Sequence, residues 1–271
     1  MTDAHCHLWD LRDYILDAEG ERRKCGTAVA VSSCTLEEFL YHEGLAKKAR
    51  EEKEAPVFCC FALHPQLSPD FLEIKDDAPV SLEAGLGLLE SLAGEGRLRA
   101  IGETGFDLYN SRYKAGEKIQ DELFSFHLNT ALKYNLPLVL HLRKAMHKIF
   151  PFAKELKKLP AVVFHSWPGT RGEGEAFLRK GINAFFSFGS AVLKNHKDAI
   201  DSAANFPSGA IVLETDAPYQ PLKGKAFSSF PDLDIICKGI AAIRKEAGSP
   251  GGTCAELEEA TTANFYRVFG N

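Results

Sequence analysis

Eight short apolar runs recur along this chain of 271 residues, separated by stretches with the composition of amphipathic helices. Most of the runs are hydrophobic throughout, which is typical of parallel strands that are covered on both faces. This pattern confines the chain to α/β folds in which strands and helices alternate. The predicted strands span residues 2–8, 27–34, 56–63, 98–103, 137–142, 161–165, 183–188 and 209–214.

Helical stretches separate these runs and close the chain. Eight parallel strands, each followed by a helix, over about 250 residues, are what a (β/α)8 TIM barrel requires. We therefore predict a single α/β domain over residues 1–271 with the TIM barrel fold. An open doubly wound sheet is the alternative, although strand number and chain length favour closure. The predicted helices span residues 36–54, 81–94, 116–134, 143–158, 171–181, 191–204, 232–248 and 254–268.

The net charge of −5 excludes a strong overall attraction to nucleic acid, so local cations or metals must hold any polyanionic substrate. The seven cysteines form an odd set without a Cys-x-x-Cys pair. This argues against a disulfide framework or a structural zinc site and indicates a reducing compartment. No secretory signal and no apolar segment of about 18 residues is visible, so we expect a cytoplasmic protein with no membrane contact. No obligate protein partner is evident.

His5 and His7 stand two residues apart in the first predicted strand. Successive strand side chains point to opposite faces, so both imidazoles project to one side, with Cα atoms roughly 6 to 7 Å apart. They can therefore converge on one metal ion. Cys6 points the other way and is not expected to be a ligand.

Further histidines and carboxylates stand where other predicted strands end. Active sites of such barrels form at the carboxyl ends of the strands, so these side chains are expected to meet. Neutral imidazoles and carboxylates are ligands of zinc, manganese and similar divalent ions. The strand-end residues are His5, His7, His64, Glu103, His141, His165 and Asp216.

Leaving out His64, the other four histidines and the two carboxylates exceed the three or four protein ligands of a single catalytic zinc. Glu103 can bridge two ions about 3.5–4 Å apart, and a water shared by such ions is activated near neutral pH. The ligand set therefore predicts two divalent ions, with Zn, Mn or Mg as candidates, and metal-assisted hydrolysis.

Six motifs resemble those of the TatD-related metal-dependent hydrolases, a branch of the amidohydrolase superfamily of barrels. Members of that family are typically metal-dependent deoxyribonucleases, so the resemblance implies DNA as the substrate. The motifs are residues 3–8 (Asp-Ala-His-Cys-His-Leu), 63–65 (Leu-His-Pro), 102–107 (Gly-Glu-Thr-Gly-Phe-Asp), 139–143 (Val-Leu-His-Leu-Arg), 163–165 (Val-Phe-His) and 213–218 (Leu-Glu-Thr-Asp-Ala-Pro).

The resemblance also implies roles for single residues. One metal would be held by His5, His7, Glu103 and Asp216, and the second by Glu103, His141 and His165. Asp216 would in addition orient or deprotonate the attacking water, so Asp216 and Glu103 are the predicted catalytic residues. His64 and Arg143 would lie near the substrate phosphate.

One segment departs from the family pattern. After the last aspartate the family usually has Arg-Gly-Lys followed by Asn-Glu-Pro, whereas residues 222–231 keep only the core Lys223-Gly224-Lys225. Lys223 and Lys225, with Arg143, are predicted to supply the local positive charge that binds DNA. Trp167 and Phe227 fall in predicted rim loops, where a base could stack on them.

Other polar residues are predicted to have structural roles and not to bind metal. Asp107 and Glu214 are expected to support ligand histidines or the loops and not to bind metal themselves. The remaining histidines lie in predicted helices and are interpreted as structural or surface residues: His42, His127, His147 and His196.

Two alternatives to a deoxyribonuclease remain. The divergent 222–231 segment motivates hydrolysis of a small amide, lactone or cyclic amide by the same metal centre. A barrel that binds without turnover is the other alternative, although it requires a lost ligand and all six are present.

Overall fold

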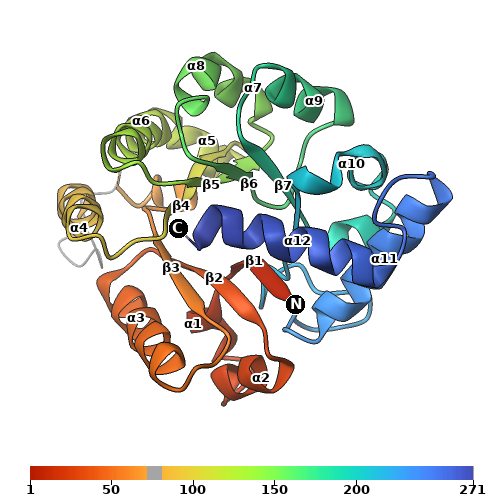
Figure 1. The fold of residues 1–271 in the computed structure, drawn as a ribbon. Coiled ribbons are helices and arrows are strands. Elements are labelled where there is room, and N and C mark those ends of the chain that lie inside the picture. Colours follow the sequence, from red (N-terminus) through yellow and green to blue (C-terminus); the bar gives the residue numbers. More distant parts are fainter. Residues whose placement is uncertain (72–80, 271) are drawn as a thin grey trace.

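The computed structural model describes residues 1–71 and 81–270 and forms a (β/α)8 barrel, which confirms the predicted fold (Figure 1). The eight strands are all parallel and follow one another around the sheet in chain order. They are β1 (Thr2–Cys6), β2 (Ala28–Ser33), β3 (Val57–Phe61), β4 (Ala100–Asp107), β5 (Leu138–Arg143), β6 (Val162–Phe164), β7 (Ala184–Phe188) and β8 (Ile211–Leu213).

The first and last strands join, which excludes the open sheet. The amide of Asp216 donates to the carbonyl oxygen of His5 at 3.0 Å, and the amide of His7 donates to that of Ala217 at 2.7 Å. A side-chain contact adds to the seam, because buried Asp3 accepts hydrogen bonds from the amide and the hydroxyl of Thr215. The residues that close the barrel are therefore direct neighbours of the predicted metal ligands.

Twelve α-helices and four short 3-10 helices are found in the described part of the chain. None of these helices is long and apolar enough to cross a membrane. The α-helices are α1 (Leu8–Leu11), α2 (Ala18–Cys25), α3 (Leu36–Glu51), α4 (Leu82–Gly94), α5 (Ser111–Ala115), α6 (Glu117–Tyr134), α7 (Met146–Ile149), α8 (Ala153–Leu156), α9 (Arg171–Arg179), α10 (Lys197–Asn205), α11 (Asp232–Glu246) and α12 (Cys254–Phe269); the 3-10 helices are η1 (Pro65–Leu67), η2 (Phe150–Phe152), η3 (Ser190–Lys194) and η4 (Ser208–Ala210).

Two predicted helices are wrong as single elements. The stretch 143–158 divides into α7, η2 and α8 around Pro151, which lacks an amide hydrogen and disfavours helical geometry in the residue before it. The stretch 191–204 divides into η3 and α10, because Asn195 adopts a left-handed φ of 60°. Helices α1 and α2 were not predicted, and the first strand ends at Cys6, two residues earlier than expected.

One end of the barrel is filled and covered by apolar side chains. Small residues such as Ala4, Ala30 and Ala100 form a buried cluster there with Phe265 and Phe269 of α12. Helix α12 crosses this end of the barrel in Figure 1. It is the amino-terminal end of the strands, since Asn264 of α12 donates to the carbonyl oxygens of Ser208 and Ile211 at the start of β8. A functional site can therefore form only at the other end of the barrel, where the carboxyl ends of the strands lie.

The close approach of β4 and β5 depends on a glycine. Gly105 lies opposite His141 in the register of these strands and has a φ of 136°. A Cβ atom at this position would lie 2.2 Å from the carbonyl oxygen of His141, so any side chain would force the strands apart. Gly105 thus permits the spacing at which Glu103 on β4 meets His141 on β5.

Candidate metal centre

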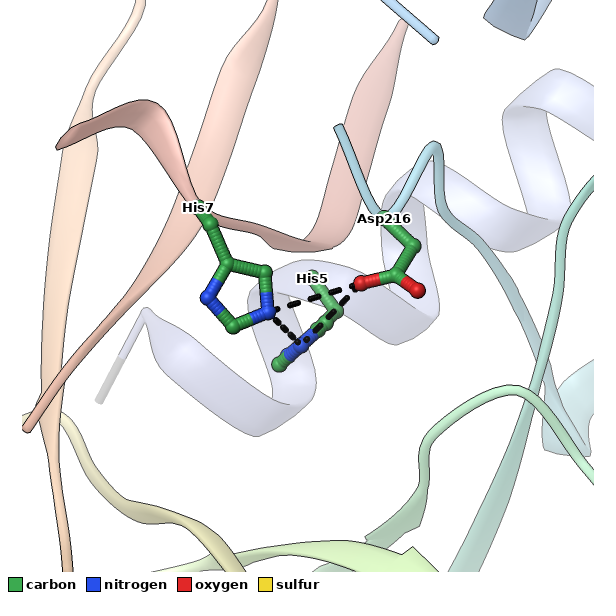
Figure 2. Close-up of side chains that lie close together, drawn as sticks. All are labelled: His5, His7 and Asp216. Carbon is green, nitrogen blue, oxygen red and sulfur yellow. Dashed lines mark hydrogen bonds and ion pairs between the residues drawn. The ribbon is translucent and has the colours of Figure 1, made fainter. Parts of the chain in front are cut away.

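His5, His7 and Asp216 converge at the carboxyl ends of β1 and β8 (Figure 2). The Nε2 atoms of the two histidines are 3.2 Å apart, and the Oδ1 atom of Asp216 lies 3.7 Å from the first and 3.5 Å from the second. Asp216 reaches this position from a left-handed backbone conformation with a φ of 56°. The side chain of Cys6 points away and is buried in a separate apolar cluster, as its place between the histidines predicts.

The carboxylate of Glu103 lies at the middle of the cluster and faces histidines from four other strand ends. Its Oε2 atom is 3.1 Å from Nε2 of His5 and 3.5 Å from Nε2 of His7. Its Oε1 atom is in hydrogen-bond contact with Nδ1 of His141 and lies 3.6 Å from Nε2 of His165. Each carboxylate oxygen therefore faces a different group of imidazoles.

His64 also faces this carboxylate, with Nε2 3.4 Å from Oε1 of Glu103. From the sequence, His64 is predicted to contact the substrate phosphate. In the structure it also lies close enough to Glu103 and His141 to be a possible metal ligand with them. Its Nδ1 atom accepts the amide hydrogen of Gln66 at 3.1 Å. A neutral imidazole that accepts at Nδ1 carries its proton on Nε2, so His64 is a hydrogen-bond donor toward the centre.

Two buried carboxylates form hydrogen-bond contacts with the second ring nitrogens of His141 and His165. Oδ2 of Asp107 lies 3.1 Å from Nε2 of His141 and also accepts from the side chain of Gln66 at 2.7 Å. Oε2 of Glu214 lies 2.9 Å from Nδ1 of His165. Such contacts fix the tautomer and orientation of a ligand histidine. Both acids occupy the supporting positions expected of them.

The charges of the cluster are strongly coupled. Burial raises the pKa of Glu103, but the neighbouring imidazoles, His64 first among them, outweigh burial and hold the pKa well below 4.5. Burial likewise raises the pKa of Asp216, and the charge of His165 with the hydrogen bond from His7 brings it down to about 2. Both carboxylates are therefore ionised at neutral pH.

The pKa of His165, in the same cluster, is shifted in the opposite direction. Burial lowers the pKa of His165, but the charges of Glu214, Glu103 and Asp216 raise it to about 10. The protein thus compensates two buried carboxylates with protonated imidazoles, and a divalent cation can replace these protons. Imidazole nitrogens and carboxylate oxygens at these separations fit a zinc- or manganese-type ion.

The cluster lies in a cavity of about 1010 Å³ at the carboxyl ends of the strands. Arg143 lines this cavity, and its guanidinium lies 3.7 Å from the ring centre of Tyr109. Further basic residues line it that the sequence did not single out: Lys144 after β5, and Lys194 and Lys197 after β7. Lys144 directly follows β5, which is a signal that the sequence offers, whereas Lys194 and Lys197 lie in η3 and at the start of α10, several residues beyond the end of β7. His196 precedes α10 and is exposed at the cavity instead of lying within a helix.

The structure does not place Lys223 and Lys225, the predicted DNA contacts, among the residues that line this cavity. Lys225 forms an ion pair with buried Asp232 at the start of α11, and Lys223 is exposed outside the cavity lining. Phe227 and Phe230 of the divergent segment pack in the apolar cluster that contains Leu8 and Leu11 of α1.

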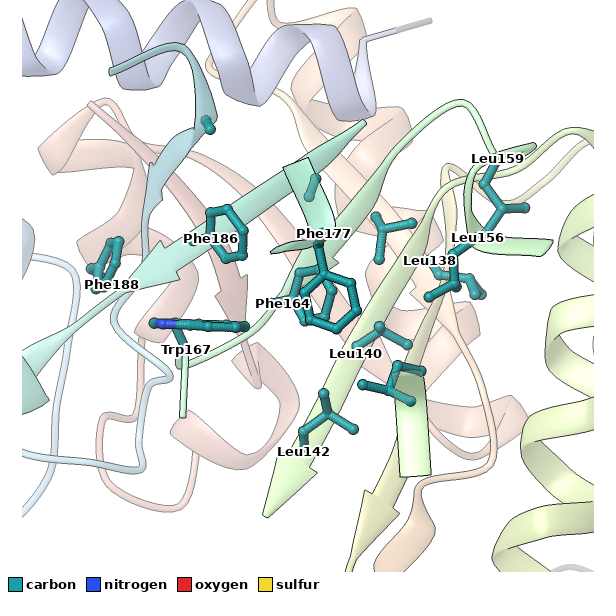
Figure 3. Packing of buried hydrophobic residues seen from close by; sticks show 14 of the residues in the cluster. Leu138, Leu140, Leu142, Leu156, Leu159, Phe164, Trp167, Phe177, Phe186 and Phe188 are labelled. Atoms are coloured by element: carbon teal, nitrogen blue, oxygen red, sulfur yellow. The ribbon is translucent and has the colours of Figure 1, made fainter. Parts of the chain in front are cut away.

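Trp167 borders the cavity but is not available for the predicted stacking. Its indole is 4% exposed and packs against Phe164 and Phe186 (Figure 3). It also contacts Phe206, and its Nε1 donates to Ser202 at 3.1 Å. Phe227 packs against Tyr14, away from the residues that line the cavity. The aromatic rings that do line the cavity with substantial exposure are Tyr109 and Tyr219, with Trp9 partly exposed.

A parallel barrel whose strand ends gather histidines around two buried carboxylates defines a metal-dependent hydrolase. The chain belongs to the TatD related DNase family, whose model matches residues 2–270. It is 28% identical over 281 residues to the uncharacterized metal-dependent hydrolase YcfH of Escherichia coli K12, covering 99% of this chain and 95% of YcfH. It is 27% identical to the uncharacterized metal-dependent hydrolase YabD of Bacillus subtilis, covering 99% and 98%.

Solved structures agree on the fold. The crystal structure of YjjV, a TatD homolog from Escherichia coli K12, matches with a TM-score of 0.79 at 24% identity, over 100% of this chain and 98% of that one. A TatD family hydrolase from Entamoeba histolytica matches with a TM-score of 0.75 at 18% identity, over 99% and 97%.

Proposed function

We propose that this chain hydrolyses the phosphodiester bonds of DNA with two divalent cations held at the cluster. The observation that carries the proposal is the position of Glu103, whose two carboxylate oxygens face different groups of imidazoles. His5, His7 and Asp216 with Glu103 would hold one cation, and Glu103, His141 and His165 the other. Zn, Mn and Mg are the candidate ions.

When bound, a pair of such ions supplies Lewis acidity and lowers the pKa of water near it. The protein contributes the orientation of the reacting groups. Asp216 is ionised and accepts a hydrogen bond from Nε2 of Gln220 at 2.8 Å, which fixes the carboxylate plane. A carboxylate held in this way can accept a hydrogen bond from the attacking water and orient it.

His64 and Arg143 are the proposed contacts to the substrate phosphate. Burial lowers the pKa of His64, so its neutral ring presents the Nε2–H toward the centre. Arg143 is exposed in the cavity, and its stacking on Tyr109 keeps the guanidinium plane in one orientation. The guanidinium geometry matches two phosphate oxygens at once. These contacts favour a phosphodiester over an uncharged amide or lactone.

The test is hydrolysis by purified protein loaded with Zn, Mn or Mg. Single- and double-stranded DNA labelled at either end would be compared with a panel of small amides, lactones and cyclic amides. We expect DNA to be cut faster than every small substrate. The Glu103→Gln protein, prepared identically, controls for contaminating nucleases. DNA left intact by the metal-loaded protein, or a faster small substrate, would reject the proposal.

A further inference from the structure

The charged residues that line the cavity outside the metal cluster are unevenly distributed. Arg143 ends β5 and Lys144 follows it, and Lys194 and Lys197 come after β7, so these cations lie on the side from β5 to β7. The lining carboxylates outside the metal cluster include Asp10 after β1 and Glu38 after β2. Strands β1 and β5 are four places apart in a barrel of eight, so these two groups face each other across the cavity.

The cationic side is not neutralised by the protein. Within residues 1–71 and 81–270, none of Arg143, Lys144, Lys194 and Lys197 forms an ion pair with a carboxylate. Asp198 lines the cavity beside Lys197, and it too takes part in no ion pair in this part of the chain. Partial burial lowers the pKa of Lys194, which is the effect of removing an ammonium from water without a partner. Four cations beside the one carboxylate of Asp198 leave this wall with a net positive charge, which attracts anions.

The opposite side presents aromatic rings. Tyr219 is 48% exposed, packs edge-on against His7 with ring centres 5.1 Å apart, and donates its hydroxyl to Asp10 at 2.9 Å. Trp9 also lines the cavity, and the guanidinium of Arg12 lies 3.4 Å from its ring centre. These contacts hold both rings in place. Asp10, which is bonded to Tyr219, disfavours a phosphate beside that ring, and the exposed ring surfaces can accept a flat uncharged group.

From this division we infer that the cavity binds one nucleic-acid strand in two parts. The β5 to β7 side holds phosphates beyond the scissile bond, and the Trp9–Tyr219 side stacks the base of the terminal nucleoside. The inference rests on the proposed function and adds to it which end of the substrate lies on which side. A base stacks on an aromatic face whatever its identity, so recognition would be of a strand end and not of a sequence.

The cationic side is tested by binding without cleavage. The full chain is kept in EDTA, and its affinity for a fluorescein-labelled single-stranded deoxyoligonucleotide is measured by fluorescence anisotropy at several NaCl concentrations. The Lys194→Ala/Lys197→Ala protein should bind more weakly, and the slope of log K against log salt should fall by about 1.4, about 0.7 for each lost phosphate contact. The matched control is Lys157→Ala/Lys158→Ala, which removes two exposed lysines at the amino-terminal end of β6. Equal slopes for the two double variants would overturn the inference.

The aromatic side is tested with two oligonucleotides that differ only at the terminal residue, one with a nucleoside and one with an abasic tetrahydrofuran, made for each end. The wild-type protein should bind the nucleoside form of one end about 10-fold more tightly, within the range measured for base stacking on aromatic rings. Trp9→Ala should reduce this preference, and Trp9→Phe should retain it. An unchanged preference in Trp9→Ala would reject the assignment of Trp9.

The experiments distinguish a failure of the proposed DNA hydrolysis from a failure of the two-sided binding site. If the metal-loaded protein leaves DNA uncut but the binding differences appear, the proposed function is wrong and the two-sided binding site stands. If DNA is cut but all variants bind like the wild type, the proposed function stands and the two-sided site is wrong.

Discussion

Nε2 of His5 lies 3.1 Å from Oε2 of Glu103, and the two side chains are only 1% and 3% exposed. An ionised carboxylate buried to this degree is costly unless positive charge surrounds it. In the described part of the chain no lysine or arginine forms an ion pair with Glu103, and the compensating groups are imidazoles from four strand ends. The stability of this end of the barrel therefore depends on the positive charge, from protons or from a metal ion, that is bound beside Glu103.

Glu103→Gln is expected to lower both bound metal and hydrolysis. The amide keeps the shape of the side chain but removes the charge that both groups of imidazoles face. We expect a loss of activity above about 100-fold, more than the 10- to 100-fold that follows from losing an outer partner of a ligand. Metal content per chain and the rate of hydrolysis check this. Glu122→Gln removes an exposed carboxylate on α6 and should leave both unchanged; equal behaviour of the two proteins would contradict the site.

Asp107→Asn is expected to affect one ion more than the other. Oδ2 of Asp107 lies 3.1 Å from Nε2 of His141. The other ring nitrogen of His141 contacts Oε1 of Glu103, whereas His5 and His7 face Oε2 of Glu103. With the acceptor charge removed, His141 should be less well oriented, and the affinity of the second ion should fall 10- to 100-fold. Titration of metal-free protein followed by metal analysis should show one tight ion retained and the other weakened. Two ions lost together, or neither, would disagree with separate sites.

The cluster itself was predictable because parallel strands in a barrel end at the same rim. Once the alternation of apolar runs indicates a barrel, His5, His141 and His165 must meet even though they are far apart in the chain. The spacing of alternating side chains also excluded Cys6. These inferences use only strand periodicity and the common direction of the strands.

Loop paths were not predictable in the same way. Lys225 pairs with Asp232, and Trp167 donates to Ser202, a residue 35 positions away on α10. Both contacts depend on how a loop packs against helices, which no local pattern encodes. Lys194 could not be predicted for a different reason: it lies in η3 after β7, and neither carries a histidine or carboxylate that would mark this part of the rim.

Removal of metal is expected to lower the melting temperature. A ligand that binds only the folded state stabilises it by about 2.7 kcal/mol when present at 100 times its Kd. At 2–4 °C per kcal/mol for a domain of roughly this size, chelation should lower the Tm by about 5–10 °C. Differential scanning calorimetry with and without EDTA measures the shift. Glu103→Gln should show a much smaller shift, and an equal one would mean that the metal stabilises the protein elsewhere.

His127 should make the metal-free protein less stable as the pH falls. This residue of α6 is completely buried; its Nε2 accepts the amide hydrogen of Leu63 at 3.4 Å, and its Nδ1 is in hydrogen-bond contact with Thr104. Burial lowers its pKa from 6.5 to about 3. Between these values the unfolded chain binds a proton that the folded chain does not. The stability is therefore complete above pH 6.5 and is lost as the pH falls toward 3, by about 1.4 kcal/mol per pH unit.

The test compares the pH dependence of two variants in EDTA. His127→Gln removes the titrating ring but keeps a hydrogen-bond acceptor and a donor. Below pH 6.5 the free energy of unfolding should therefore fall less steeply than in the wild type, by about 1.4 kcal/mol per pH unit, the slope that one proton contributes. His147→Gln removes an exposed histidine and should leave the wild-type slope. Urea denaturation at half-unit steps from pH 7 to 4.5 gives the slopes. Because each slope is taken within one variant, a general loss of stability from the substitution cancels. A wild-type slope in His127→Gln would mean that the buried ring is protonated in the folded protein, and its contact with the Leu63 amide would then have to break.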